Sequence, residues 1–148
     1  MDFYKLLKQT PVFSFLYNSK VSAGFPSPAL DYLEERIDLV NQLTPRPLST
    51  FYVRSEGFSM IDACIPPNSI LTVDKSLNAA TGDIVIAFLE GSFTIKFIKF
   101  ENGKCFLVPA NKHNIYPIIE ITAEMEMVVW GVVTNVIIDT KFLKSCMP

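Results

Sequence analysis

Short runs of apolar residues follow one another along the chain after residue 49, and they predict a series of β-strands. Turn-forming residues separate the runs about every ten positions, and the pair Asn102-Gly103 is a strong signal for a tight hairpin. Gly131, inside the last run, predicts a bulge or bend. The expected strands are residues 50–54, 70–74, 84–89, 92–100, 105–108 and 125–138. We therefore expect a mainly β domain of twisted antiparallel strands.

A helical pattern precedes these strands. Ser27 is a suitable N-cap, and Pro28 fits the first helical position, where its missing N–H costs nothing. Apolar residues then recur at helical spacing until the pattern fades near Leu43, before two prolines; they are Leu30, Leu33, Ile37 and Val40. Residues 1–26 carry apolar side chains without a clear period. The sequence thus predicts a flexible N-terminal arm, residues 1–26, and a domain, residues 27–148, that begins with one helix.

The composition narrows the classes of function. The chain has 148 residues, of which 49% are hydrophobic and 19% charged, which is enough for one core. A net charge of -2 argues against direct binding to nucleic acid. No apolar run approaches the roughly 18 residues of a membrane span. Val21-Ser22-Ala23 resembles a signal-peptide cleavage site, but Asp2 and Lys20 fit a signal poorly. We expect a cytoplasmic protein without membrane contact.

Cysteine and histidine are scarce. Cys64, Cys105 and Cys146 form an odd set without metal-ligand spacing, so we expect free thiols in a reducing compartment and neither a metal site nor a cofactor. The single histidine, His113, sits in a polar stretch that is typical of a loop. This placement argues against a Ser-His-Asp triad.

Lysine is the remaining candidate for a general base. Lys96 lies in a run with apolar residues at both strand parities, so both faces of that strand are expected to be covered. Burial disfavours the charged amine and lowers the pKa of lysine. Ser59 follows Gly57 on an expected turn, where backbone N–H groups can face a developing oxyanion. The local pattern also allows a lysine that reaches solvent and a serine that only forms a turn.

Several short motifs, taken in order, resemble one family. They are Gly24-Phe-Pro-Ser-Pro28, Gly57-Phe-Ser-Met60 followed by Asp62, Val73-Asp74, Gly82-Asp-Ile-Val85, Phe93-Thr-Ile-Lys96 and Gly131-Val-Val133. Together they resemble the UmuD proteins of the LexA/UmuD family of self-cleaving Ser-Lys peptidases. The resemblance spans most of the chain, and each motif alone is a weak signal.

The resemblance implies a compact LexA/UmuD-like peptidase domain and specific roles for its residues. Ser59 matches the nucleophile and Lys96 the general base. The backbone N–H groups of Phe58 and Ser59 match the oxyanion hole, and the bond between Ala23 and Gly24 matches the self-cleavage site. Phe58 departs from the family, where aspartate is common, and this change could alter a dimer or partner surface.

The same resemblance implies a biological role in the SOS response to DNA damage. A RecA filament on single-stranded DNA would stimulate cleavage after Ala23, and the shortened homodimer would serve a UmuC-like translesion polymerase as an accessory subunit. Residues 125–138 are a candidate dimer surface or, equally, part of the core. Two alternatives stay open: a non-catalytic dimeric binding module with this fold, and a leader-type signal peptidase, which would need a membrane anchor.

Overall fold

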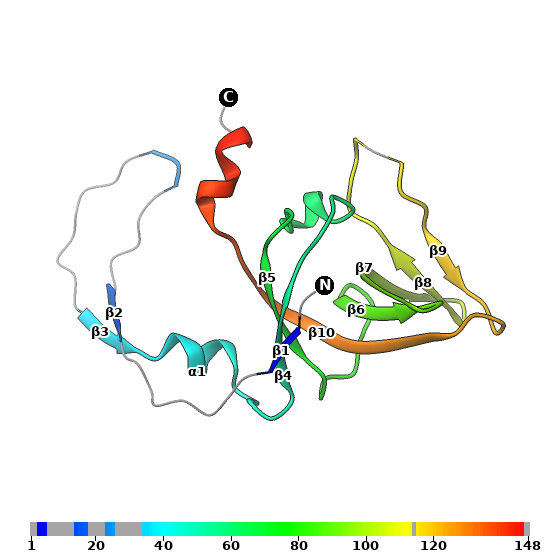
Figure 1. The fold of residues 1–148 in the computed structure, drawn as a ribbon, viewed down its shortest axis with the longest axis horizontal. Helices are drawn as coiled ribbons and strands as arrows, with labels where there is room; N and C mark the ends of the chain where they lie inside the picture. Colours follow the sequence, from blue (N-terminus) through cyan, green and yellow to red (C-terminus); the bar gives the residue numbers. More distant parts are fainter. Residues whose placement is uncertain (1–2, 6–13, 18–22, 26–33, 114, 147–148) are drawn as a thin grey trace. The chain divides into compact units, whose positions relative to one another are not determined.

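The computed structural model describes residues 3–5, 14–17, 23–25, 34–113 and 115–146 (Figure 1). The chain divides into two compact units, one formed by residues 1–7 with 46–148 and the other by residues 8–45. The described part is mainly β, with one short α-helix, as the sequence predicts. The division at residue 26 stays a prediction, because residues 26–33 lie outside the described part.

The larger unit is built on one eight-stranded antiparallel sheet with the order β1-β4-β5-β10-β6-β7-β8-β9 (Figure 1). Its strands are β1 (Phe3–Lys5), β4 (Thr50–Arg54), β5 (Ile70–Asp74), β6 (Ile84–Leu89), β7 (Ser92–Glu101), β8 (Lys104–Val108), β9 (Ile119–Ile121) and β10 (Met127–Ile137). All six expected strands are present with small shifts at their ends. The sequence did not predict β1 or β9, which are three residues each and lie at the two edges of the sheet.

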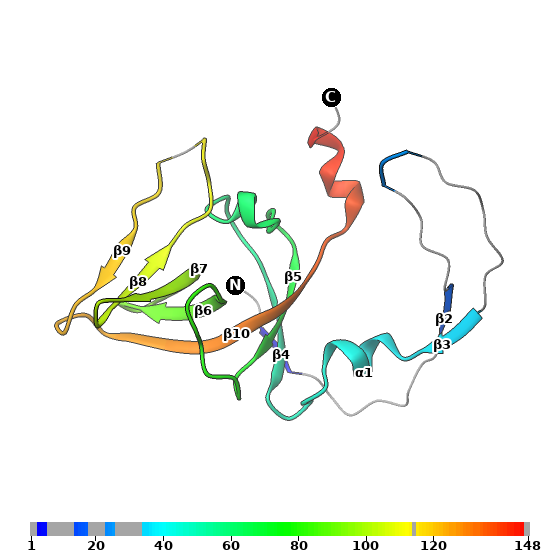
Figure 2. The ribbon, with the colours of Figure 1, turned by 180° about the vertical axis from the view of Figure 1, so that it is seen from behind.

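Two long strands join the parts of this sheet. The first half of β10 pairs with β6 and its second half with β5, so that it runs through the middle of the sheet (Figure 2). Strand β7 pairs with β6 over residues 92–97 and with β8 over residues 97–101. The register of β10 against β6 shifts between Val129 and Gly131, which confirms the irregularity expected at the glycine.

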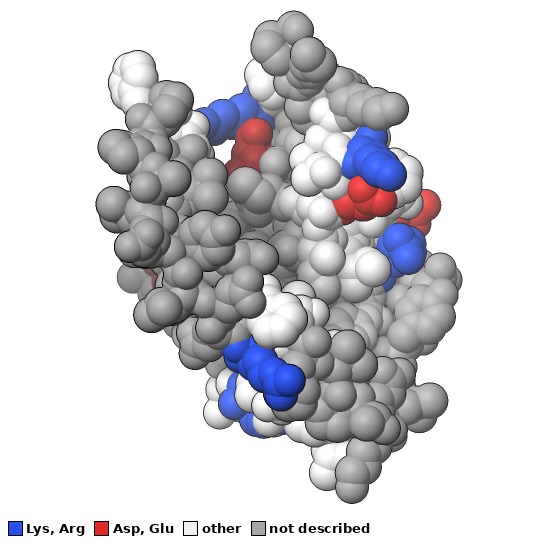
Figure 3. Space-filling view, turned by 90° about the vertical axis from the view of Figure 1, so that its left-hand side faces the viewer, with Lys and Arg blue, Asp and Glu red and all other residues white. Residues whose placement is uncertain are grey.

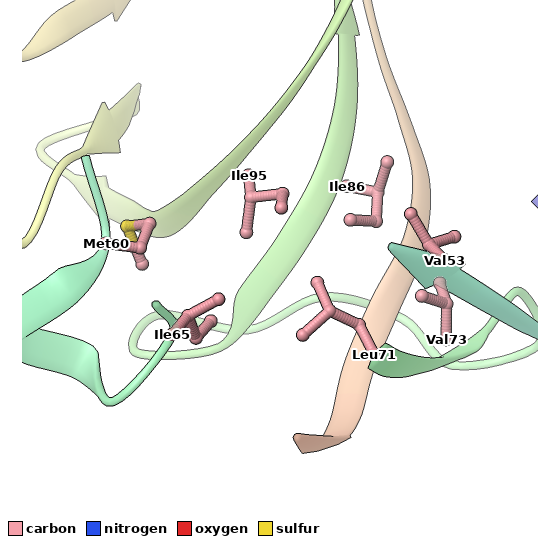
Figure 4. Packing of buried hydrophobic residues seen from close by; sticks show 7 residues of the cluster. All are labelled: Val53, Met60, Ile65, Leu71, Val73, Ile86 and Ile95. Carbon is pink, nitrogen blue, oxygen red and sulfur yellow. The ribbon is translucent and has the colours of Figure 1, made fainter. Parts of the chain in front are cut away.

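Branched aliphatic side chains fill the centre of the larger unit. One cluster joins β4, β5, β6 and β7 to the segment after β4, and it contains Val53, Met60, Ile65, Leu71, Val73, Ile86 and Ile95 (Figure 4). A second cluster contains Val85, Ala87, Ile98, Leu107 and Val132. Neighbouring positions of β6 and β7 thus contribute to different clusters, because successive side chains of a strand point to opposite faces. Both faces are covered, as expected for β7.

In the smaller unit, the helix is shorter than the sequence predicts. Residues 34–37 form strand β3 (Glu34–Ile37), which pairs with β2 (Ser14–Tyr17), and the helix is limited to α1 (Leu39–Leu43). Backbone bonding to β2 outweighs the helical spacing of the apolar residues, and Asp38 caps α1 by accepting a hydrogen bond from the Asn41 N–H at 3.0 Å. The expected cap at Ser27 and Pro28 lies outside the described residues.

The end of the chain leaves the sheet. A 3-10 segment, η2 (Thr140–Cys146), follows β10. Among the described residues, no helix has the length and apolar character needed to cross a membrane.

Candidate active site

Ser59 lies on a turn that follows β4. Gly57 has a φ of +80°, in the left-handed region that favours glycine, and the 3-10 helix η1 (Ile61–Ala63) begins two residues after Ser59. The next residue, Met60, is buried in the core. The turn is thus anchored at Met60 while the Ser59 side chain stays half-buried at the surface of the sheet.

Lys96 occupies the middle of β7 and is 8% exposed. Its Nζ lies 2.9 Å from Ser59 Oγ, although the two residues are 37 positions apart in the sequence. Burial of the ammonium group lowers the pKa of Lys96 below its ordinary value of 10.5. The structure thus brings together the two residues singled out in the sequence and places the lysine where a neutral amine is favoured.

Two further groups contact the lysine amine. Its Nζ donates to Thr94 Oγ1 at 2.9 Å and to the Ile95 carbonyl at 3.0 Å. A neutral amine has two N–H groups and one lone pair, so Thr94 and Ile95 can accept both N–H groups while the lone pair faces Ser59 Oγ. The sequence reasoning missed Thr94. Its position two residues before Lys96, on the same side of the strand, is a signal that could have found it.

The loop between β8 and β9 braces the nucleophile turn. Ala110 donates its N–H to the Ser59 carbonyl at 2.7 Å, and the Asp62 N–H donates to the Ala110 carbonyl at 2.8 Å. The Asn111 side chain donates from Nδ2 to the Phe58 carbonyl at 2.8 Å. No local pattern predicts these contacts, because this loop is about fifty residues from the turn in the sequence and has no hydrophobic period.

The expected oxyanion donors lie on the same turn. Within the described part of the chain, the hydrogen bonds of the turn engage the carbonyls of Phe58 and Ser59, and no carbonyl acceptor is present for the N–H groups of these two residues. The Phe58 side chain is 56% exposed and does not fill the core. Backbone N–H groups of this kind can stabilise a negatively charged oxygen.

A cavity of about 340 Å³ opens beside Ser59. The turn after β4 forms one wall and the start of β7 the other; the lining residues are Ser55, Glu56, Gly57, Ser59, Met60, Ile65, Ser92, Phe93, Thr94 and Ile95. The wall is partly apolar and partly polar. A cavity of this size and mixed lining lies within the range of ligand-binding pockets.

The remaining sequence candidates lie elsewhere. Ala23 and Gly24 are exposed residues of a bend in the smaller unit, and their role as a cleavage site stays a prediction. Cys64 is exposed, and burial raises the pKa of the half-buried Cys105 thiol. The side chain of Cys146 lies outside the described part. His113 is an exposed loop residue, and the described residues include no metal-binding group of three or more His, Cys, Asp or Glu side chains.

Comparison with known proteins agrees with the motifs. A model of the family described as Peptidase S24-like matches residues 15–134. Protein MucA of Salmonella typhimurium is 38% identical over 83% of this chain and 83% of its own length. Protein SamA of the same species is 38% identical over 90% of this chain and 93% of its own. The LexA repressor of Carboxydothermus hydrogenoformans is 41% identical over 62% of this chain and 45% of its own.

Proposed function

Because this chain belongs to the Peptidase S24-like family, we propose that it is a serine endopeptidase that cleaves itself after Ala23. Ser59 is the nucleophile and Lys96 is the general base. The observation that carries this proposal is the contact of 2.9 Å between Lys96 Nζ and Ser59 Oγ in a site that disfavours the ammonium form.

The reaction follows from the groups around the dyad. Neutral Lys96 takes the hydroxyl proton as Ser59 Oγ attacks the carbonyl carbon of Ala23. The N–H groups of Phe58 and Ser59 stabilise the oxyanion of the tetrahedral intermediate. The intermediate collapses as the Ala23–Gly24 bond breaks, and Lys96 returns the proton to the departing amine of Gly24. Water then hydrolyses the ester on Ser59, again with Lys96 as the base.

Control of the reaction lies in the supply of substrate. The Lys96–Ser59 contact is already present in the larger unit, so the rate depends on the fraction of time for which the Ala23–Gly24 bond occupies the site. The tethered substrate has a high effective concentration once docked. A RecA filament on single-stranded DNA raises the docked population in this proposal, and cleavage yields residues 24–148.

The cleaved product acts in the SOS response as a homodimeric accessory subunit of a UmuC-like translesion polymerase in the cytoplasm. The similarity to MucA and SamA over most of each chain supports this role. Contact with DNA is indirect: the net charge is -2, and the face in Figure 3 carries acidic side chains next to basic ones.

An apolar area on the sheet supports the dimer. Val128 pairs with Phe88, and Phe88 pairs with Phe93, so the three side chains lie in one row across β10, β6 and β7. Val128 is 55% and Phe93 is 39% exposed. The second half of β10 instead contributes Val132 to the core. Of the expected surface at residues 125–138, we therefore assign the first part to the dimer.

The test of the proposed function is cleavage of the intact, purified chain at mildly alkaline pH. We expect a slow cut between Ala23 and Gly24, detected by mass spectrometry, which RecA filaments accelerate. Ser59→Ala and Lys96→Ala stop the cut. The matched control Lys99→Ala, which changes an exposed lysine of β7, remains folded and is cut.

An uncut chain with and without RecA filament would contradict the peptidase and support a non-catalytic binding module. Continued cleavage in Ser59→Ala or Lys96→Ala would remove that residue from the mechanism. Circular dichroism of each variant shows whether a loss of cleavage comes from loss of folding.

A further inference from the structure

The peptide group between Phe58 and Ser59 is held from its carbonyl side. Its oxygen accepts hydrogen bonds from Asn111 Nδ2 at 2.8 Å and from the Ile61 N–H at 3.3 Å. A trans peptide is planar, and its C=O and N–H bonds point in opposite directions. A donor that fixes the Phe58 carbonyl therefore also fixes the direction of the Ser59 N–H.

The Asn111 amide has a defined orientation. Its Oδ1 accepts a hydrogen bond from the His113 N–H at 2.9 Å, so its Nδ2 is the atom that faces the Phe58 carbonyl. The loop is tied to the turn on both sides of this residue: Ala110 donates to the Ser59 carbonyl at 2.7 Å, and the Lys112 N–H donates to Asp62 Oδ2 at 2.5 Å. The loop thus presents the amide as a fixed donor.

We propose that Asn111 is a positioning residue of the reaction: its side-chain amide fixes and polarises the Phe58–Ser59 peptide so that the Ser59 N–H is aimed at the oxyanion. This inference rests on the proposed function, because it assigns a role within the same oxyanion site. Hydrogen bonds in a chain strengthen one another, so donation to the Phe58 carbonyl makes the Ser59 N–H a better donor. Asn111 itself does not touch the reacting atoms.

The expected loss of cleavage rate follows from the indirect role of Asn111. Removal of a direct oxyanion donor lowers kcat by about 10² to 10³-fold. Loss of Asn111 leaves the Ser59 N–H in place but free to turn away, so we expect a loss of about tenfold or somewhat more on the same scale. Lys96 Nζ contacts Ser59, Thr94 and the Ile95 carbonyl, so we expect its titration to stay unchanged when only the Asn111 amide is removed.

The experiment compares three variants of the full chain. Asn111→Asp has nearly the same shape and keeps the acceptor for His113, but it places a carboxylate oxygen against the Phe58 carbonyl. Asn111→Ala removes the donor without adding charge. Lys112→Ala is the matched control, since it shortens the exposed side chain next to Asn111 and keeps both the backbone bond to Asp62 and the contact on the Phe58 carbonyl.

The readout is the first-order rate of self-cleavage as a function of pH. We expect the high-pH plateau to fall at least tenfold in both Asn111 variants, with the midpoint of Asn111→Ala unchanged and Lys112→Ala within about threefold of the wild type. Thermal unfolding followed by circular dichroism confirms that the variants compared are folded.

Each outcome decides the inference separately from the proposed function. A wild-type chain that does not cleave contradicts the peptidase itself. A wild-type chain that cleaves, with Asn111→Ala at the same plateau, overturns the role of Asn111 alone. An equal loss in Lys112→Ala also overturns it, because the loss would then reflect a general disturbance of the loop and not the missing amide.

Discussion

The Thr94→Val substitution tests two effects on the Lys96 amine separately: its orientation toward Ser59 Oγ and its pKa. Thr94 Oγ1 accepts from Lys96 Nζ at 2.9 Å, and Ile95 and Ser59 provide the other two contacts of the amine. Valine keeps the branched shape and suits a β-strand. The change thus removes one hydrogen-bond acceptor and little else.

The loss affects the two protonation states unequally. A hydrogen bond from a charged group contributes about 1.5–3 kcal/mol, against about 0.5–1.5 kcal/mol for a neutral one. The ammonium form therefore loses about 1–1.5 kcal/mol more than the amine, which lowers the pKa of Lys96 further. Burial already lowers this pKa, so both effects have the same sign.

The amine also loses part of its alignment. With one N–H group unpaired, the lone pair can turn away from Ser59 Oγ, and general-base catalysis is worth about 10² to 10⁴-fold. We expect the plateau at high pH to fall about tenfold, as a fraction of that contribution. At pH values below both midpoints, the larger fraction of neutral amine offsets this loss, so the two rate curves converge.

The assay is the rate of self-cleavage of full-length wild type, Thr94→Val and Thr94→Ser across a pH range that includes the plateau. Serine keeps the acceptor and should reproduce both the midpoint and the plateau of the wild type. A Thr94→Val chain whose midpoint moves to higher pH would refute the electrostatic reasoning. An unchanged plateau would refute the alignment of the lone pair.

Two further predictions concern the sheet that supports the site. A Cβ added at Gly131 would lie 2.5 Å from Val73 Cγ1, so Gly131→Ala should lower the free energy of unfolding by about 1–3 kcal/mol, and urea denaturation should show a smaller loss in a Val73→Ala background. Burial alone would raise the pKa of Asp74, but hydrogen bonds from Ser76, Arg46 and Ser49 outweigh it and hold the pKa below 3.8. Asp74→Asn should lower the free energy of unfolding by about 2–3 kcal/mol at neutral pH. This difference is present above pH 3.8 and disappears as the pH falls through the lowered pKa of Asp74. An equal difference at all pH values would contradict a stabilising role for the Asp74 carboxylate charge.

Local chemistry made much of the sheet predictable. Asn102 and Gly103 have φ values of 51° and 74°, and the hairpin between β7 and β8 turns at this pair as expected. The mixed parity of the run around Lys96 indicated a strand covered on both faces, and the two core clusters on either side of β7 account for it. In both cases the signal lies within a few neighbouring residues.

The features that the sequence did not reveal depend on distant partners. Residues 34–37 lie within the helical pattern of apolar residues that runs from Leu30 to Val40. They form a strand because β2 supplies backbone hydrogen bonds. Ala110 and Asn111 hold the nucleophile turn across about fifty residues, and neither belongs to a periodic pattern. The local pattern made Lys96 and Ser59 candidates, but their pairing came from the resemblance of several short motifs to one family, since their separation in the sequence carries no geometric information.

Burial of Lys96 favours the neutral amine that catalysis needs, and it also lowers the stability of the folded chain. Its folded pKa lies below the ordinary value of 10.5, so the unfolded chain binds more protons than the folded chain between the two values. Stability therefore rises with pH across that window, and below the folded pKa the buried ammonium destabilises the sheet to its full extent. The rate of a lysine-based reaction rises over the start of the same window, as the amine becomes neutral. The contacts of Lys96 with Thr94 and Ile95 reduce this cost and direct the lone pair, so the same hydrogen bonds contribute to both the stability and the chemistry of the site.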